Sequence, residues 1–244
     1  MWFLFSKFKA KKWNKYSYEK RFKIYVALEK KVAKKLKIEP VKLEINYEDW
    51  NCFGAFSYDG LNQKIVINSI LLEQPQYRFH GMETIAHETR HAYQFSVISR
   101  KLHWFEFTAK KWKENWSGYF SSSKDNVIYN NQAVERDAQK YSIKFLKKHS
   151  YDNDPDYVKT FNAVLGRYEN ADDEARKKFG IFYKYKINRQ IKKNSRYWFT
   201  LNFIFYIQLF IRYRQVLFRR RVIDKKRCFQ RLSFQQVWFH LNQV

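Results

Sequence analysis

The amino-acid sequence predicts an α+β fold in which a short antiparallel or mixed sheet packs on one central helix. Residues 41–47 alternate between apolar and polar side chains, which is the pattern of a half-buried strand. Residues 53–58 and 64–68 are two further strand-like runs, and the turn sequence between them contains Asp, Gly and Asn. Residues 84–94 then read as one helix that carries two histidines four positions apart.

A lysine-rich helix is expected ahead of the sheet, between residues 16 and 36. Its apolar positions recur at helical spacing, and lysines fill the opposite face. We expect this helix to cover one side of the sheet, and a position along a membrane surface is the alternative. We assign residues 1–39, which include it, to a basic amphipathic N-terminal segment.

The helix at residues 84–94 contains the motif His87-Glu88-x-x-His91. Two histidines four apart lie about 40° apart around a helix and one turn along it, so both imidazoles can bind one metal ion. Glu88 points about 100° away from His87 and can act as a general base without ligating the metal. Zinc suits this arrangement, because it lowers the pKa of a water to about 7 and polarises the carbonyl group that the resulting hydroxide attacks.

The alternative is that these residues met by accident on a charged helix. A chance His-Glu-x-x-His is rare in a chain of this length. The surrounding residues are partly apolar, so the two histidines and the glutamate are expected to be buried, and buried polar side chains need a binding partner such as a metal ion. His80 lies two helical turns before His87, and we expect it to be a solvated or capping histidine instead of a ligand.

A catalytic zinc ion takes three protein ligands and leaves one coordination position open. Glu135 is our candidate for the third ligand, because it lies at the edge of the apolar stripe of a second helix, where a carboxylate can point inward. His103 is the rival, but the metzincin pattern would place a third histidine at Val97. Asp137 is a candidate to accept a hydrogen bond from a ligand histidine.

The two stretches together resemble the gluzincin arrangement of zincin metallopeptidases. His-Glu-x-x-His-Ala-Tyr-Gln, followed by Asn-Gln-x-x-Glu-x-Asp-Ala, is similar to small uncharacterised zincin-like domains of Gram-positive bacteria and their mobile elements, over residues 41–146. The resemblance implies a strand layer on an active-site helix and hydrolysis of a peptide or protein substrate. It also implies zinc ligation by His87, His91 and Glu135, with Glu88 as the base. The chain departs from the thermolysin-like pattern at Gln139, where that pattern has an aspartate.

We therefore expect a zinc-dependent metallopeptidase, a hydrolase that works through a Glu-activated water. The alternative is a non-catalytic metal-containing binding protein that attaches to nucleic acid or membrane through its basic ends. Glu88 separates the two hypotheses, because a closed structural zinc site has four protein ligands and does not need a carboxylate beside an open position.

Two segments are candidates for contact with a substrate. An extended peptide can pair with a sheet edge beside the metal, and residues 64–68 are the candidate edge; a purely structural hairpin is the alternative. Residues 96–130 form a long aromatic and basic connection. We assign part of this connection to the rim of the cleft, with core packing as the alternative.

The positive charge is concentrated at the two ends of the chain. The formal net charge is +25, of which residues 1–39 carry +10 and residues 184–244 carry +14. Such ends favour an anionic partner, either nucleic acid or a phospholipid surface, and simple solubilisation is the alternative. No recognised nucleic-acid-binding motif accompanies them.

The sequence indicates a cytoplasmic protein. Cys52 and Cys228 offer neither a disulfide framework nor a cysteine-based zinc site, and the N-terminal apolar run is too short for a secretory signal. Residues 197–211 are uncharged, and as a helix they would extend about 22 Å, short of the roughly 30 Å core of a bilayer. An interfacial segment that associates with the membrane is therefore favoured over a spanning helix, and a tail that was never selected to fold is a third hypothesis.

The remaining boundaries follow from cap and turn residues. We expect one helix after Asp154 and a second that is capped by residues 170–173 and ends at Gly180. We assign residues 40–183 to the metallopeptidase domain and residues 184–244 to a basic, aromatic C-terminal tail of uncertain fold.

Overall fold

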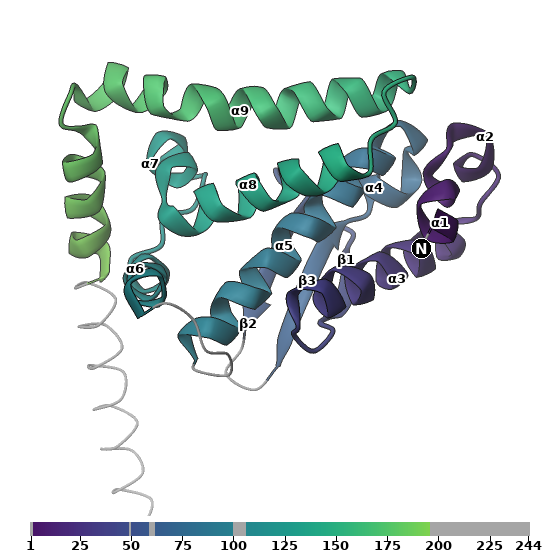
Figure 1. Ribbon diagram of the computed structural model, residues 1–244, viewed down its shortest axis with the longest axis horizontal. Coiled ribbons are helices and arrows are strands. Elements are labelled where there is room, and N and C mark those ends of the chain that lie inside the picture. Colours follow the sequence, from purple (N-terminus) through teal and green to yellow (C-terminus); the bar gives the residue numbers. More distant parts are fainter. Residues whose placement is uncertain (1, 49, 59–61, 100–105, 196–244) are drawn as a thin grey trace, which may run out of the picture. The chain divides into compact units, whose positions relative to one another are not determined.

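The computed structural model describes residues 2–48, 50–58, 62–99 and 106–195. These residues belong to the first of two compact units, which runs from Met1 to Ser195. The expected α+β class is confirmed, since helices pack with a small three-stranded mixed sheet (Figure 1). The hypotheses on residues 197–211 concern a segment outside the described residues.

The elements follow one another along the chain as strands enclosed between helices. The helices are α1 (Trp2–Phe5), α2 (Ala10–Trp13), α3 (Tyr18–Leu36), α4 (Ile70–Glu73), α5 (Arg78–Ile98), α6 (Glu106–Ser117), α7 (Asn126–Asn131), α8 (Ala133–Lys148) and α9 (Pro155–Phe179). The strands are β1 (Lys42–Asn46), β2 (Gly54–Tyr58) and β3 (Gln63–Asn68). Short 3₁₀ turns occupy Ser6–Phe8 and Pro75–Tyr77, and residues 183–195 form a further helical segment.

The strand order is β1-β3-β2, with β3 parallel to β1 and antiparallel to β2. The prediction that residues 64–68 form a sheet edge is therefore wrong, because β3 is paired on both sides. The apolar character of β3 explains its central place: Ile65 and Ile67 are fully buried, and Ile65 lies opposite both Leu43 and Phe56. In the part of the sheet that the structure describes, β2 is the edge that lies beside α5.

The lysine-rich helix α3 packs on α5 and shares one hydrophobic core with the sheet. Ser17 caps α3 by accepting a hydrogen bond from Lys20 N at 3.3 Å. The buried residues of α3, Tyr25 among them, belong to the same core as Ile65 and Ile67 of β3. Gly81 of α5 permits this close approach, because a Cβ there would lie 2.0 Å from the hydroxyl oxygen of Tyr25.

The start of α5 is tied to the N-terminal segment and to the start of α9 through one buried arginine. Arg78 donates from Nε to the carbonyl of Phe8 at 3.0 Å and from Nη2 to Asp154 Oδ1 at 2.6 Å, and it also pairs with Asp156. Phe8 is itself fully buried and stacks on Trp13 with ring centroids 5.1 Å apart. The N-terminal segment therefore packs into the main core.

A single helix, α9, replaces the two helices expected between Asp154 and Gly180, so that prediction is wrong. Asp173 lies on the exposed face of α9 and pairs with Arg176 one turn later at 3.3 Å, which is compatible with continuous helix. Ala171 and Ala175, four residues apart, are buried on the opposite face. The expected end at Gly180 is confirmed.

Residues 184–195, which the sequence prediction assigned to the C-terminal tail, fold within the first compact unit. Ile187 and Ile191 are buried in one cluster with Ile128 of α7 and Ala175 of α9. Their spacing of four residues places them on one face of the helical segment, so the segment buries an apolar stripe against the domain.

The described helices were compared with the length and apolar character of a membrane-spanning helix. Within the described ranges, none of them combines the length and the apolar character that crossing a bilayer requires.

Candidate metal centre

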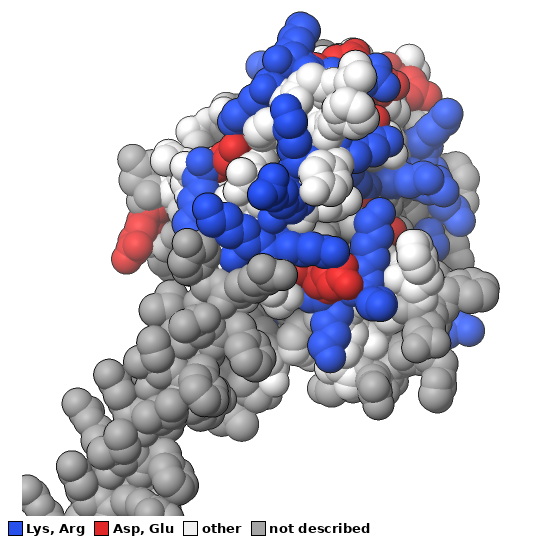
Figure 2. All heavy atoms as spheres, turned by 90° about the vertical axis from the view of Figure 1, so that its left-hand side faces the viewer, with Lys and Arg blue, Asp and Glu red and all other residues white. Residues whose placement is uncertain are grey.

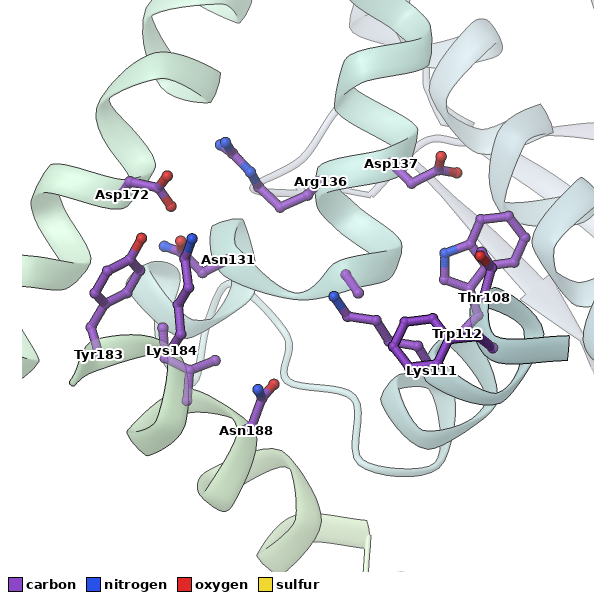
Figure 3. Close-up of a pocket in the computed structure, with 13 residues that line it drawn as sticks. Thr108, Lys111, Trp112, Asn131, Arg136, Asp137, Asp172, Tyr183, Lys184 and Asn188 are labelled. Carbon is purple, nitrogen blue, oxygen red and sulfur yellow. The ribbon is translucent and has the colours of Figure 1, made fainter. Parts of the chain in front are cut away.

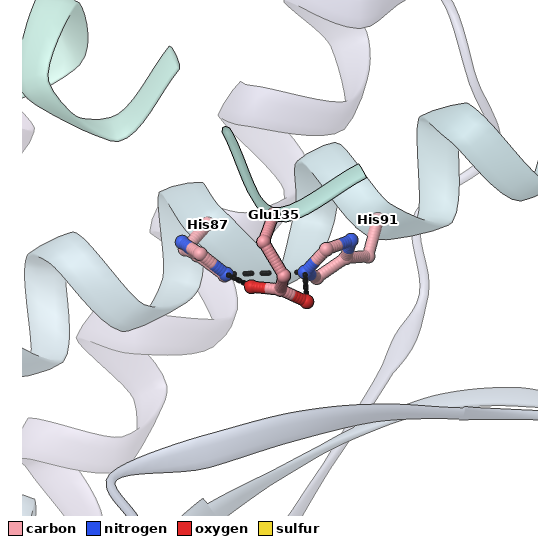
Figure 4. A group of neighbouring side chains, drawn as sticks. All are labelled: His87, His91 and Glu135. Atoms are coloured by element: carbon pink, nitrogen blue, oxygen red, sulfur yellow. Dashed lines mark hydrogen bonds and ion pairs between the residues drawn. The ribbon is translucent and has the colours of Figure 1, made fainter. Parts of the chain in front are cut away.

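Three buried side chains meet between two helices, α5 and α8. His87 and His91 project from α5, and Glu135 projects toward them from the first turn of α8 (Figure 4). The Nε2 atoms of the two histidines are 3.0 Å apart, and each lies 3.2 Å from an oxygen of Glu135. The three residues singled out for metal binding are thus brought together by the fold.

Local structure explains why these three groups converge. The histidines are four residues apart on α5, so they lie on one face one turn apart. Glu135 is in the first turn of α8, where the helix dipole favours a carboxylate. Val134 and Ala138 are fully buried, and this apolar face of α8 turns Glu135 inward toward α5.

The donor atoms fit a single metal ion. Four ligands at about 2.0–2.1 Å in tetrahedral geometry stand roughly 3.3 Å from one another. The two histidine Nε2 atoms are 3.0 Å apart, which is close to that value. One oxygen of Glu135 lies 3.2 Å from each of them, Oε2 from His87 and Oε1 from His91. Glu135 is fully buried and both histidines are buried, so the group is enclosed and can hold a metal ion.

His91 is oriented by a chain of hydrogen bonds behind it. Gln94 donates from Nε2 to the Val134 carbonyl at 2.9 Å and to Asp137 Oδ2 at 2.8 Å, so its oxygen faces His91 Nδ1 at 2.9 Å. His91 Nδ1 therefore donates, which leaves Nε2 as the atom that can bind metal. Asp137, which is paired with Arg90 Nε at 2.7 Å, reaches the ligand histidine through Gln94 and not directly.

His87 has an acidic neighbour on its far side. Glu83, one turn earlier on α5, places Oε1 3.8 Å from His87 Nδ1. The same oxygen accepts a hydrogen bond from Ser142 Oγ of α8 at 2.8 Å. Both histidines therefore have an acceptor-bearing residue on the Nδ1 side, and their Nε2 atoms point at Glu135.

Glu135 is held by a tyrosine as well as by the histidines. Tyr119 donates its hydroxyl hydrogen to Glu135 Oε1 at 2.7 Å. Burial and the nearby Glu135 carboxylate raise the pKa of Tyr119, and the same two causes raise that of Tyr129. Both phenols therefore remain protonated and can donate to the carboxylate.

The charges of His87, His91 and Glu135 compensate one another. Burial alone would raise the pKa of Glu135, but His91 and His87 hold it well below its ordinary value. Burial lowers the pKa of His91, but the Glu135 carboxylate more than offsets this and raises it to about 9. The shifts favour a protonated His91 beside an ionised Glu135, so the positive charge on the imidazole compensates the buried carboxylate.

Glu88, the candidate base, lies on α5 between the two histidines and touches the sheet edge. Its Oε2 accepts a hydrogen bond from the backbone N–H of Phe56 in β2 at 2.7 Å. Burial raises the pKa of the Glu88 carboxyl, and the neighbouring histidines oppose that rise. Gly54 lets β2 approach α5 closely, since a Cβ there would lie 2.5 Å from Thr84 Cγ2.

Two further histidines near the motif, His80 and His103, were considered as metal ligands. His80 does not belong to the group that can hold a metal; it packs against Phe53 with ring centroids 4.7 Å apart. His103, the rival third ligand, lies outside the described residues, as do Trp104 and Phe105 of the aromatic connection.

Part of the aromatic connection between α5 and α8 contacts the candidate ligands His91 and Glu135. Trp116 of α6 lies edge-on to His91 with ring centroids 5.7 Å apart, and it stacks on Tyr119 at 5.8 Å. Phe56 of the edge strand contacts Trp116 from the other side, at 6.0 Å. Aromatic side chains from β2 and α6 therefore flank the site.

A separate hollow of about 460 Å³ lies near the far side of α8 (Figure 3). Its lining residues come from α6, α7, α8, α9 and residues 183–195, and they include Trp112 and Asp137. None of the three candidate ligands lines this hollow, so it is distinct from the metal group.

No protein-family model, curated protein or solved structure matches this chain.

Several residues around the ligands were not anticipated from the sequence. Gln94 and Glu83 lie three residues after His91 and four before His87, and this helical spacing could have identified both. Tyr119 carries no comparable signal, because it comes from a loop 16 residues before Glu135.

Proposed function

We propose that this protein is a zinc-dependent metallopeptidase in which His87, His91 and Glu135 bind the metal and Glu88 is the general base. The observation that carries the proposal is the enclosed group of two histidine nitrogens and one carboxylate, all within 4.8 Å of one another, in which both histidines lie on the same helix as Glu88 and the carboxylate comes from α8. The resemblance of the motif to gluzincins agrees with this assignment.

The donor set supports zinc over other common ions. Imidazole nitrogens suit zinc, whereas calcium and magnesium sites are built from oxygen ligands. Three protein ligands leave one position open for water or substrate, which is the arrangement of catalytic zinc sites. When bound, zinc would supply a water of lowered pKa and a Lewis acid for the substrate carbonyl.

Glu88 is suited to accept a proton beside that open position. The Phe56 N–H holds one carboxylate oxygen and thereby fixes the orientation of the group. Burial raises the pKa of Glu88, which brings a carboxylate closer to the range in which a general base works at neutral pH. Glu88 can then pass the proton to the leaving amine, as peptide-bond hydrolysis requires.

The edge strand β2 gives the substrate a place to bind. Asn68 N donates to the Phe53 carbonyl at 2.9 Å, so alternate residues from Phe53 onward hydrogen-bond to β3. The backbone groups of Gly54, Phe56 and Tyr58 consequently face away from β3. An extended peptide can pair with these groups and lie beside α5, and binding would free Glu88 from the Phe56 N–H.

The alternative is a non-catalytic metal-containing protein that binds nucleic acid or membrane through its basic ends. In either case we propose a cytoplasmic location, with electrostatic attachment to an anionic surface through the ends of the chain. The buried carboxylate of Glu88 favours the enzyme, because a structural metal site has no use for a base held next to an open position.

The test compares Glu88→Gln with the unchanged protein on a peptide library, with mass spectrometry to detect cleavage. The amide keeps the shape of the side chain but cannot take a proton, so cleavage should fall by about 10²–10⁴-fold while zinc stays bound. Glu114→Gln, at an exposed position on α6, is the matched control and should behave as the unchanged protein. Equal cleavage by Glu88→Gln would refute the proposed mechanism.

A further inference from the structure

The end of α9 forms a sharp corner with the helical segment at residues 183–195. Gly180 has a φ of 75° and a ψ of −169°, a backbone conformation that is essentially restricted to glycine. Its N–H donates to the Arg176 carbonyl at 2.8 Å, and its own carbonyl accepts from Tyr183 N at 3.0 Å. The two residues between these bonds, Ile181 and Phe182, are thereby placed at the tip of the corner.

Three large apolar side chains at this corner are directed into solvent. Ile181 is 83% exposed, Phe182 67% and Tyr185 66%. The next residues along the segment show the opposite behaviour, since Ile187 and Ile191 are buried in the domain. An aliphatic and two aromatic side chains exposed within five residues are a feature of interaction sites.

The same corner is strongly basic. Residues 176–193 contain eight Lys and Arg and no Asp or Glu. Lys178 pairs with Asp125 at 2.9 Å, whereas exposed cations of both helices point outward, among them Lys177, Lys192 and Lys193. Figure 2 shows this end of the molecule, where Lys and Arg side chains predominate over acidic ones.

We propose that the corner at residues 176–193 binds the surface of an anionic phospholipid bilayer. Its lysines and arginines would lie at the headgroups, and Ile181, Phe182 and Tyr185 would enter the boundary between headgroups and acyl chains. Exposed apolar side chains surrounded by cations combine the two contributions that hold a protein at such an interface, apolar burial and attraction to anionic lipid.

A bilayer explains these features better than nucleic acid does. Lysines and stacking aromatics would serve a nucleic acid equally well, but an exposed isoleucine gains little from phosphates or bases. None of the three apolar residues lines the hollow beside α8, whereas single-stranded nucleic acid is bound along a groove. The proposal depends on neither the metal nor hydrolysis, and it places the contact on folded residues within the first compact unit.

The experiment measures co-sedimentation of the full-length protein with phosphatidylcholine vesicles that do or do not contain phosphatidylserine. The test variants replace the tip residues in Ile181→Ser/Phe182→Ser/Tyr185→Ser and the outward cations in Lys177→Glu/Lys192→Glu/Lys193→Glu. Matched controls are Tyr47→Ser, at a tyrosine 72% exposed beside β1, and Lys23→Glu/Lys30→Glu/Lys34→Glu, at exposed positions of α3. All substitutions are at exposed sites, so the fold should persist, and thermal unfolding checks this.

Each test variant should bind phosphatidylserine vesicles at least roughly tenfold more weakly than its control does. Binding of the unchanged protein should persist in part when salt is raised from about 0.1 M to about 1 M, because apolar insertion is not screened. Test variants that bind vesicles as the controls do would overturn the proposal. Loss of binding to duplex DNA or single-stranded RNA with unchanged vesicle binding would also overturn it and identify the corner as a nucleic-acid surface.

Discussion

Tyr119 donates a hydrogen bond to Oε1 of Glu135 at 2.7 Å, and this contact links the candidate metal group to the C-terminal end of the compact unit. Asn194 donates from Nδ2 to the carbonyls of Gly118 and Tyr119, at 3.2 and 3.0 Å. A Cβ at Gly118 would lie 2.1 Å from the Ile191 carbonyl oxygen, so the loop and the last described helical segment are in close contact. The position of the third candidate ligand therefore depends on residues far along the chain.

Removing the Tyr119 hydroxyl should weaken metal binding. Tyr119→Phe keeps the ring stacked on Trp116 but removes the hydrogen bond from Tyr119 to Glu135, and such orienting contacts typically change metal affinity by about 10–100-fold. Zinc affinity can be measured by competition with a chromophoric chelator. Tyr185→Phe removes the same atom at an exposed site and should leave the affinity unchanged. Equal affinity in both variants would show that Tyr119 does not position Glu135.

The helical segment at residues 183–195 should contribute to the stability of the domain. Ile191 is buried, so Ile191→Ala should lower the free energy of unfolding by about 2–5 kcal/mol, whereas the exposed neighbour substitution Lys192→Ala should change it by less than about 0.5 kcal/mol. Urea unfolding measures both. Equal effects of the two substitutions would place this segment outside the cooperative unit.

Glu29 should make the stability of the domain depend on pH. Burial raises the pKa of Glu29 from 4.5 to about 7, while the hydrogen bond from Val41 N opposes this rise. The folded state thus binds the proton more tightly, and this contribution to stability is present at low pH and is lost as the pH rises from about 4.5 to about 7.

Glu29→Gln can still accept from Val41 N and carries no charge at any pH. Relative to the unchanged protein, the variant should therefore gain stability between about pH 5 and about pH 8, as measured by urea unfolding at both values. A stability difference that is the same at the two pH values would contradict the assignment.

The periodicity of the sequence was sufficient to predict the three candidate ligands. His87 and His91 lie on one face of their helix because they are four residues apart. Glu135 lies at the edge of an apolar stripe, and a carboxylate that is buried there needs a positively charged or hydrogen-bonding partner. The strands at β1, β2 and β3 were predicted for a similar reason, since alternation and turn residues are local signals.

Features set by contacts distant in the sequence were not predictable in this way. Nothing local places β3 between β1 and β2, so residues 64–68 were wrongly expected at an edge. Asp137 acts through Gln94 because the separation between α5 and α8 leaves room for an amide, and a spacing along the chain does not encode that distance. The basic composition of residues 184–195 concealed their apolar stripe, which consists of only Ile187 and Ile191.

Metal binding should release a proton. The Glu135 carboxylate raises the pKa of His91 to about 9, so at about pH 7 its imidazole holds a proton that a metal must displace. Zinc affinity should therefore increase as the pH rises toward about 9. Calorimetric titration in two buffers of different ionisation enthalpy measures the proton released. A binding enthalpy that is independent of the buffer would contradict a protonated His91 beside Glu135.

The zinc content of the purified full-length protein tests the central claim most directly. The unchanged protein should hold about one zinc ion per chain, and His87→Ala, His91→Ala and Glu135→Ala should each lose most of it. His80→Ala, which removes a histidine of the same helix outside the metal group, should keep the full content. A protein that takes up no zinc, or a His87→Ala variant that retains as much as His80→Ala, would contradict the account.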